Sequence, residues 1–120
     1  MFDVAVASEI IEHVANPGAF LGHVSSVVAP GGSVMVSTIN RTPRAYALAV
    51  VAAERVLGLA PPGTHAWEAF IQPEELVVMG EAAGLSVRHT AGMWYDPVRN
   101  EWGLGTDVGV NYVMHFVKEG

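Results

Sequence analysis

The feature that most constrains the fold is a strand, a helix and a second strand in close succession. Residues 2–7 form a short, almost continuously apolar run, which is typical of a strand buried on both faces of a sheet. After the turn at Asn16–Gly18, apolar residues recur every three to four positions over residues 19–29, which predicts an amphipathic helix. The turn Pro30–Gly32 ends this helix, and residues 33–38 form the second apolar run. This βαβ unit predicts two parallel strands and therefore an α/β fold.

The rest of the chain adds further helices and strands to this unit. The expected elements are a short helix at Glu9–Val14, helices at Arg44–Leu59 and Pro73–Ala83, and strands at Leu85–Tyr95 and Val108–Lys118. A turn-rich loop over residues 96–107 joins the two strands. A doubly wound sheet usually has a glycine-rich turn after its first strand. This chain contains no such turn, so it is interpreted as the second half of such a sheet.

Composition excludes several classes of protein. Of the 120 residues, 51% are hydrophobic and 15% are charged, which excludes an intrinsically disordered chain. A net charge of −6 with only six Lys and Arg argues against a nucleic-acid partner, because phosphate binding needs clustered basic side chains. The absence of cysteine excludes disulfides and thiolate metal sites. The longest uncharged apolar run, residues 45–53, is too short to span a bilayer.

Two carboxylates and an imidazole follow directly after the first expected strand. On a helix over residues 9–14, Glu9, Glu12 and His13 stand at positions i, i+3 and i+4, which share one face. Such a group can bind a hard cation such as Mg²⁺ or Mn²⁺, and the imidazole also tolerates Zn²⁺. Exposed acids at a helix N-terminus and a histidine with no ligand role explain the same pattern. Ser8 stands just before the group and can cap the helix.

Five segments of the chain are similar to a known family. Two of them, Phe2–Val14 and Ala29–Ser33, resemble segments that are common to class I S-adenosylmethionine-dependent methyltransferases. The more specific segments are Ser37–Tyr46, Gly63–Ile71 and Val110–Tyr112. Together the five resemble the ubiquinone-biosynthesis O-methyltransferase family. The similarity runs from Phe2 to about Lys118 but corresponds only to the C-terminal half or so of the family's proteins.

The resemblance implies roles for individual residues. In the family, the matching Glu, Glu and His bind a divalent cation, Mg²⁺ or a similar ion, which assigns this role to Glu9, Glu12 and His13 here. The preceding serine lines the S-adenosylmethionine pocket, which assigns Ser8 to that cofactor. The implied reaction is O-methylation of a polyprenyl catechol, in which the cation stabilises the phenolate and aligns it with the sulfonium methyl group. His13 is alternatively a general base, although one residue is not expected to serve both roles.

The resemblance also implies partners and a location. The family is peripherally associated with membranes, and its insertion corresponds to about residues 41–63 of this chain. A helix buried against the core explains the apolar pattern of this segment equally well. The implied partners are a polyprenyl catechol substrate, a membrane surface and other ubiquinone-biosynthesis enzymes. The implied location is the matrix side of the mitochondrial inner membrane, or the cytoplasmic membrane face in a bacterium.

The expected fold class is α/β, the C-terminal part of a class I methyltransferase Rossmann-like sheet, without its first strands and Gly-rich turn. Residues 1–120 then form a partial domain, and the strand at residues 2–7 has an unpaired edge. We therefore expect little methyltransferase activity from this chain alone, and S-adenosylmethionine binding detected by calorimetry would contradict that expectation. The alternatives are an incomplete fragment that serves as a binding or assembly module of the ubiquinone-synthesis complex, and a class I methyltransferase acting on another small molecule.

Aromatic and histidine side chains receive simpler interpretations. His23 is expected to face solvent on the amphipathic helix, and His65 is a candidate for substrate contact. The remaining aromatic residues are expected to pack the segment after Gly63 or the last two strands; they are Trp67, Phe70, Trp94, Tyr95 and Trp102.

Overall fold

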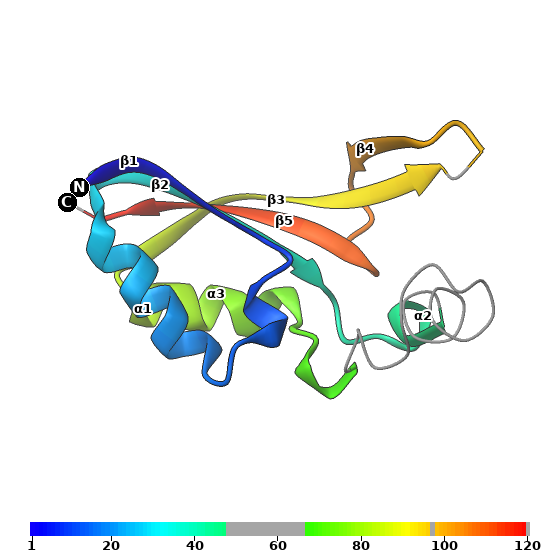
Figure 1. Cartoon of the computed structure of the whole chain (residues 1–120), viewed down its shortest axis with the longest axis horizontal. Helices are drawn as coiled ribbons and strands as arrows, with labels where there is room; N and C mark the ends of the chain where they lie inside the picture. The colour runs from blue at the N-terminus through cyan, green and yellow to red at the C-terminus, as the bar shows by residue number, and fades with distance from the viewer. Residues whose placement is uncertain (48–66, 97, 120) are drawn as a thin grey trace.

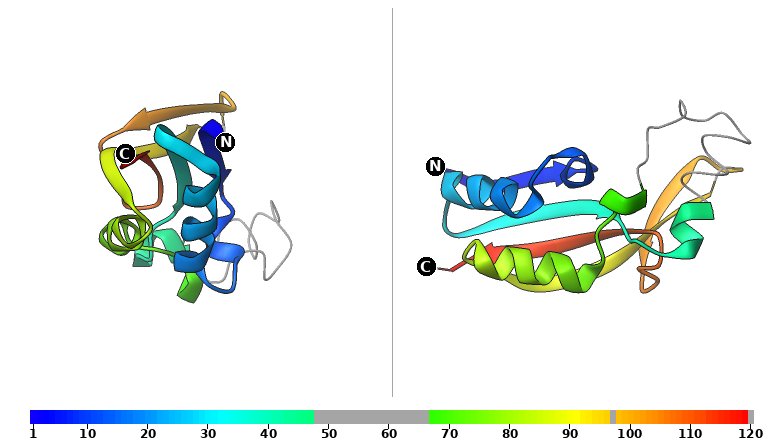
Figure 2. Two further views of the ribbon diagram at one scale, coloured as in Figure 1. Left: turned by 90° about the vertical axis from the view of Figure 1, so that its left-hand side faces the viewer. Right: turned by 90° about the horizontal axis from the view of Figure 1, so that it is seen from below.

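One five-stranded sheet with two helices on the same face makes up the fold (Figures 1 and 2). The computed structural model describes residues 1–47, 67–96 and 98–119. The strands lie in the order β1-β2-β5-β3-β4 across the sheet. Their bounds are Phe2–Ser8 (β1), Val28–Ile39 (β2), Leu85–Asp96 (β3), Glu101–Gly105 (β4) and Asn111–Lys118 (β5). The helices are α1 (Pro17–Val27) and α3 (Pro73–Ala82).

The first two strands confirm the βαβ unit, since β1 and β2 are parallel and α1 connects them. All other neighbouring strands are antiparallel. Helix α1 ends at Val27, slightly before its expected end. Phe2 pairs with Val28 and Val4 pairs with Ser33, so residues 29–32 bulge out of the register. The predicted turn is therefore an irregularity within β2.

Local sequence explains where the helices begin and end. The side chain of Asn16 accepts a hydrogen bond of 3.0 Å from the backbone N–H of Ala19, and Pro17 occupies the first turn of α1. Helix α3 begins with a capping box, in which the backbone N–H of Gln72 donates to the Glu75 carboxylate at 2.9 Å. After α3, Gly84 adopts a φ of +81°, as a residue that ends a helix often does.

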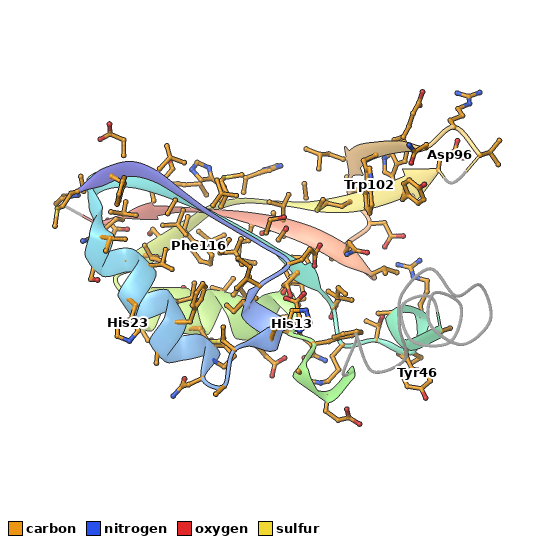
Figure 3. All side chains as sticks on the ribbon, viewed as in Figure 1. His13, His23, Tyr46, Asp96, Trp102 and Phe116 are labelled. Atoms are coloured by element: carbon orange, nitrogen blue, oxygen red, sulfur yellow. The ribbon has the colours of Figure 1, made fainter. Side chains whose placement is uncertain are left out.

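The core lies between the sheet and the two helices. Phe116 points from β5 into this layer (Figure 3), and its ring meets α3 at Gly80. A Cβ atom on Gly80 would lie 2.3 Å from that ring, so only glycine lets the helix approach so closely. The other fully buried large side chains come from both layers; they include Ile11, Leu21, Val34, Val36, Leu76 and Tyr112.

The outer strand β1 is less buried than its apolar sequence predicts. Val4 and Val6 are 57% and 68% exposed, while Ala7 on the opposite face is buried against the core. The prediction of burial on both faces is therefore wrong for the described residues, because no helix covers the second face and no strand pairs with the outer edge of β1. The expected unpaired edge is present.

A hairpin replaces part of the predicted loop between the last two strands. Strand β4 lies within residues 96–107 and pairs with the end of β3, which projects beyond the helices (Figure 1). Trp94 and Trp102 are 50% and 60% exposed, and the Trp94 ring lies over Gly103 of β4. Tyr95 is exposed as well, and its ring lies against Trp102 with centroids 4.8 Å apart and planes tilted by 36°. The three aromatic residues therefore pack between β3 and β4, and not between the two strands that were expected. His23 is exposed on α1, as predicted (Figure 3).

Only the start of the expected helix at residues 44–59 is described, as the short helix α2 (Pro43–Ala45). The rest of it, most of the expected insertion at residues 41–63, and His65 lie outside the described residues. Of Trp67 only the backbone is described, in the 3-10 turn η3 (Trp67–Ala69), whereas Phe70 is buried as expected. Within the described ranges, no helix has the length and apolar character needed to cross a membrane.

Candidate functional site

The candidate site lies where β1 and β2 end side by side. Parallel strands have their carboxyl ends at the same edge of the sheet, so Ser8 and Ser37 are register partners. The Ser37 hydroxyl donates a hydrogen bond of 3.2 Å to the Ser8 hydroxyl, and the backbone N–H of Glu9 donates to the Ser37 carbonyl at 2.9 Å. Two adjacent strand ends thus place the predicted cofactor residue, Ser8, beside the first predicted metal ligand.

The backbone at Glu9 differs from the predicted helix. Glu9 adopts a φ of +54°, which is uncommon for a residue with a side chain and is incompatible with a right-handed helix. Only Ile11–His13 is helical, as the 3-10 turn η1. The expected helix at residues 9–14 is therefore wrong, and with it the argument that one helix face aligns the three side chains. The positive φ turns the chain sharply as it leaves the strand, so β1 is followed by a short turn.

The two carboxylates nevertheless come together under the end of the sheet. Glu12 is buried, and one of its oxygens, Oε2, accepts a hydrogen bond of 2.8 Å from the hydroxyl of Thr38. Glu9 is half-buried, and its Oε1 accepts a hydrogen bond of 3.2 Å from the side-chain amide of Asn111. Its other oxygen, Oε2, is buried and receives no hydrogen bond from the described residues. One oxygen of each carboxylate is thus held by a strand residue.

The repulsion between the two carboxylates favours a proton or a cation between them. Burial, followed by the charge of Glu12 and a side-chain hydrogen bond with Glu12, raises the pKa of Glu9 from 4.5 to about 7. Two carboxylates can hydrogen-bond to one another only if one of them carries a proton. A proton or a metal cation between them would relieve both the repulsion and the unpartnered buried oxygen. The donor set is therefore compatible with a hard divalent cation.

His13 is the last residue of η1 and directly follows Glu12 (Figure 3). Its side chain is 52% exposed, and its Nε2 is 3.8 Å from Oε1 of Glu12. Across the described part of the chain, no three His, Cys, Asp or Glu side chains are grouped closely enough to hold a metal ion. The structure therefore brings the two glutamates together and leaves the imidazole in contact with Glu12 alone.

A cavity of about 270 Å³ opens beside Glu12. One wall follows η1 and the start of α1, and the other is formed by η3 and α3; the walls include Val14, Pro17, Phe70, Ile71 and Met79. Arg41 also lines the cavity. Its guanidinium donates a hydrogen bond of 3.0 Å to the Phe70 carbonyl and forms an ion pair of 3.0 Å with Glu75. The hydrogen bond from the Gln72 backbone, followed by Arg41, lowers the pKa of Glu75 below its ordinary value. The cavity thus combines an apolar wall with a paired arginine and the buried Glu12.

Sequence reasoning missed Thr38 and Asn40, and assigned no chemical role to Asn111 and Tyr112. The side-chain amide of Asn40 donates to the Val108 carbonyl at 2.9 Å and joins the end of β2 to the loop before β5. Tyr112 donates to the Ile71 carbonyl at 2.6 Å, and its burial raises the pKa of its hydroxyl. The available signal was that Thr38, Asn111 and Tyr112 stand in the apolar strands β2 and β5, and that Asn40 directly follows β2.

The comparison with protein families matches a methyltransferase-domain model to residues 1–90. Among curated relatives, a ubiquinone biosynthesis O-methyltransferase of Pseudoalteromonas translucida is 44% identical over 98% of this chain and 50% of its own length. One from Azorhizobium caulinodans is 48% identical over 94% of this chain and 45% of its own length. A mitochondrial one from Arabidopsis thaliana is 43% identical over 98% of this chain and 36% of its own length. This chain therefore spans about half the length, or less, of these relatives.

Solved structures share the fold at lower sequence identity. A methyltransferase of Thermotoga maritima, described as a possible histamine N-methyltransferase, has a TM-score of 0.64 at 18% identity, over 98% of this chain and 56% of its own. The magnesium protoporphyrin IX methyltransferase of Synechocystis, solved with bound S-adenosylhomocysteine, has a TM-score of 0.59 at 15% identity, over 98% of this chain and 45% of its own. Both matches confirm the predicted fold class, part of a class I methyltransferase sheet.

Proposed function

Because this chain belongs to the methyltransferase-domain family, we propose that it forms part of an S-adenosylmethionine-dependent O-methyltransferase of ubiquinone biosynthesis. Its acceptor is a polyprenyl catechol. The observation that carries this proposal is the pair of carboxylates, the half-buried Glu9 and the buried Glu12, at the carboxyl edge of the parallel strands. In open α/β sheets, ligands bind at this edge. The names of the curated relatives support the pathway and the type of acceptor atom.

The proposed reaction includes a divalent cation such as Mg²⁺, which the unpartnered oxygen of Glu9 and the carboxylate of Glu12 would hold. His13, whose Nε2 lies 3.8 Å from Oε1 of Glu12, is the proposed third ligand. When bound, the cation supplies Lewis acidity that favours the ionised catechol, and S-adenosylmethionine supplies the methyl group. The chain's own residues supply position. Ser8, which accepts a hydrogen bond from Ser37 at the strand ends, would face the cofactor, and the cavity beside Glu12 would receive part of the acceptor.

The acceptor's long apolar tail suggests where the enzyme works. A polyprenyl chain partitions into a bilayer, so the enzyme would act as a peripheral protein at a membrane surface, near other enzymes of the same pathway. This surface would be the matrix side of the mitochondrial inner membrane or the cytoplasmic face of a bacterial membrane. The segment at about residues 41–63 is the proposed contact, and most of it lies outside the described residues.

An assembly role is the second candidate. It is favoured by the bare sheet face and exposed edge of β1, where Val4 and Val6 are accessible. Such a surface can bind another protein without any chemistry taking place. The two functions differ in their requirement for Glu12, since a surface role would not need a buried carboxylate.

A chimera tests the enzymatic proposal directly. This sequence would replace the matching half of the Pseudoalteromonas relative, and the chimera would be expressed in a bacterium that lacks its ubiquinone O-methyltransferase. We expect restored ubiquinone by mass spectrometry, loss of at least about 100-fold in methylation rate for Glu12→Gln, and no change for the exposed Glu81→Gln. A folded chimera in which Glu12→Gln remains fully active would exclude the proposed role of the site, whereas a folded chimera that restores no ubiquinone would overturn the enzymatic proposal and favour the assembly role.

A further inference from the structure

Two strand residues contact the carboxylate pair and have no role of their own in the proposed methyl-transfer reaction. Thr38, on β2, is fully buried and donates to Oε2 of Glu12. Asn111, the first residue of β5, donates to Oε1 of Glu9 from a position 102 residues further along the chain. Both contacts reach across the sheet edge from strands that do not carry the glutamates.

The two hydrogen bonds leave a specific pair of oxygens available. Oε2 of Glu9 is buried and receives no donor from the described residues. Oε1 of Glu12 has His13 Nε2 at 3.8 Å, beyond hydrogen-bond distance. Each carboxylate therefore has one oxygen held by a donor from the sheet, and its other oxygen is not bonded to a strand residue in the described structure. This is the arrangement that a cation needs, because hydrogen bonds to ligating carboxylates orient them toward the metal.

We propose that Thr38 and Asn111 are positioning residues that hold Glu12 and Glu9 in place for a divalent cation. This inference rests on the proposed function of the two glutamates as cation ligands. Without the two donors, carboxylates of like charge would rotate away from each other and toward solvent. With them, the two carboxylates stay close to each other, and a cation that binds between them relieves their repulsion.

The sheet itself makes the positioning accurate. Thr38 pairs with Tyr112 across β2 and β5, and the neighbouring pair is Ile39 with Asn111. The two donors therefore lie on adjacent rungs of one antiparallel ladder, and their relative position is fixed by backbone hydrogen bonds. Asn111 also pairs with Met93 on β3, so its backbone is held between two strands. Ligand supports on rigid elements hold geometry better than supports on loops.

Titration with Mn²⁺ tests the proposal without measuring catalysis. Binding of Mn²⁺ to the purified chain is followed by electron paramagnetic resonance, with circular dichroism as the control for folding. The variants are Thr38→Val, which keeps the shape and removes the hydroxyl, Thr38→Ser, which keeps the hydroxyl, and Asn111→Leu. We expect the dissociation constant to rise about 10- to 100-fold for Thr38→Val and Asn111→Leu, and to stay within about threefold for Thr38→Ser.

The possible outcomes separate the two proposals. Unchanged Mn²⁺ affinity in folded Thr38→Val and Asn111→Leu would overturn the positioning role and leave the cation site intact. Equal losses in Thr38→Val and Thr38→Ser would overturn the role of the Thr38 hydroxyl, because both variants then act through packing. Absence of Mn²⁺ binding to the unmodified chain would overturn the cation site and the positioning role together. Should Thr38→Val not fold, the partly exposed Asn111 supplies the independent test.

Discussion

At the scale of single residues, Glu9 combines an uncommon backbone with an unfavourable charge. Its positive φ and its buried, unpartnered oxygen each cost free energy in the folded chain. Such costs persist where the surrounding structure overdetermines them, and they are concentrated at functional sites. The neighbouring Glu12 raises the cost further, since its carboxylate is buried beside that of Glu9. A residue kept only for stability would not need this arrangement.

The pH dependence of folding follows from this charge. The folded-state pKa of Glu9 is about 7, above its ordinary value of 4.5, so its contribution to stability is present below pH 4.5 and is lost as pH rises through 7. With a chelator present, we expect this contribution to the free energy of unfolding to fall by about 1–3 kcal/mol across that range. Glu9→Gln should remove this part of the pH dependence. Urea denaturation at pH 5 and at pH 7.5 measures the free energy of unfolding of the unmodified chain and of Glu9→Gln. An equal change in this free energy between the two pH values in both proteins would contradict the prediction.

At the scale of elements, the packing of α3 on β5 depends on a residue without a side chain. The ring of Phe116 occupies the space that a Cβ atom of Gly80 would need. Glycine weakens a helix interior, so its presence in α3 is explained by this contact and not by helix propensity. The position of α3 is therefore set by its packing against Phe116, although the glycine lowers the intrinsic stability of the helix.

A pair of glycine variants tests this explanation. Gly80→Ala should lower the free energy of unfolding by about 1–3 kcal/mol, because the helix must lift from the Phe116 ring. Gly22→Ala, in α1, should raise it by about 0.5–1 kcal/mol, because no atom lies within 4 Å of the new Cβ and alanine favours the helix. Urea midpoints compare the two. A stabilising effect of Gly80→Ala would show that the helix adjusts without cost.

The proposed membrane segment is tested by flotation with liposomes. We expect the unmodified chain to float with vesicles and Val51→Asp to remain in the lower fraction, because a charge placed in an apolar contact opposes burial in the interface. The exposed Val78→Asp on α3 is the matched control and should float like the unmodified chain. Equal flotation of the unmodified chain and Val51→Asp would exclude docking through this segment.

At the scale of the whole molecule, the sheet has one covered and one open face. Helices α1 and α3 both lie on the same side, and β1 forms the outer edge of the described sheet (Figure 2). An apolar strand in this position can pair with another chain. The curated relatives extend well beyond the length of this chain.

Self-association should depend on this edge. Val6→Lys should raise the protein concentration at which light scattering detects aggregates by about threefold or more, because a charged edge discourages strand pairing. Val78→Lys is the matched control, since the two valines are 68% and 67% exposed but only Val6 lies on the open strand. If both variants change scattering equally, net charge and not the edge is responsible.

The sequence by itself determined the order of most elements but not β4, which lies in a segment predicted as a loop. The period of the apolar residues identified β1, α1, α3 and the last strands, and the turn residues set their ends to within a few positions. These features are local, since a cap such as Asn16 acts on its own helix. The same sequence placed Ser8, Glu9 and Glu12 at the end of a strand, because parallel strands present their carboxyl ends to ligands.

Only the tertiary structure decided how those residues meet. It replaced the predicted helix by a positive φ at Glu9 and a 3-10 turn, because the chain must leave β1 and pass under the sheet. It brought Thr38 and Asn111 to the two carboxylates through strand pairing over long sequence separations. It also left β1 exposed on one face, because no helix of the described residues covers that face. Contacts between residues far apart in sequence have no local signal, and for that reason the site required the fold.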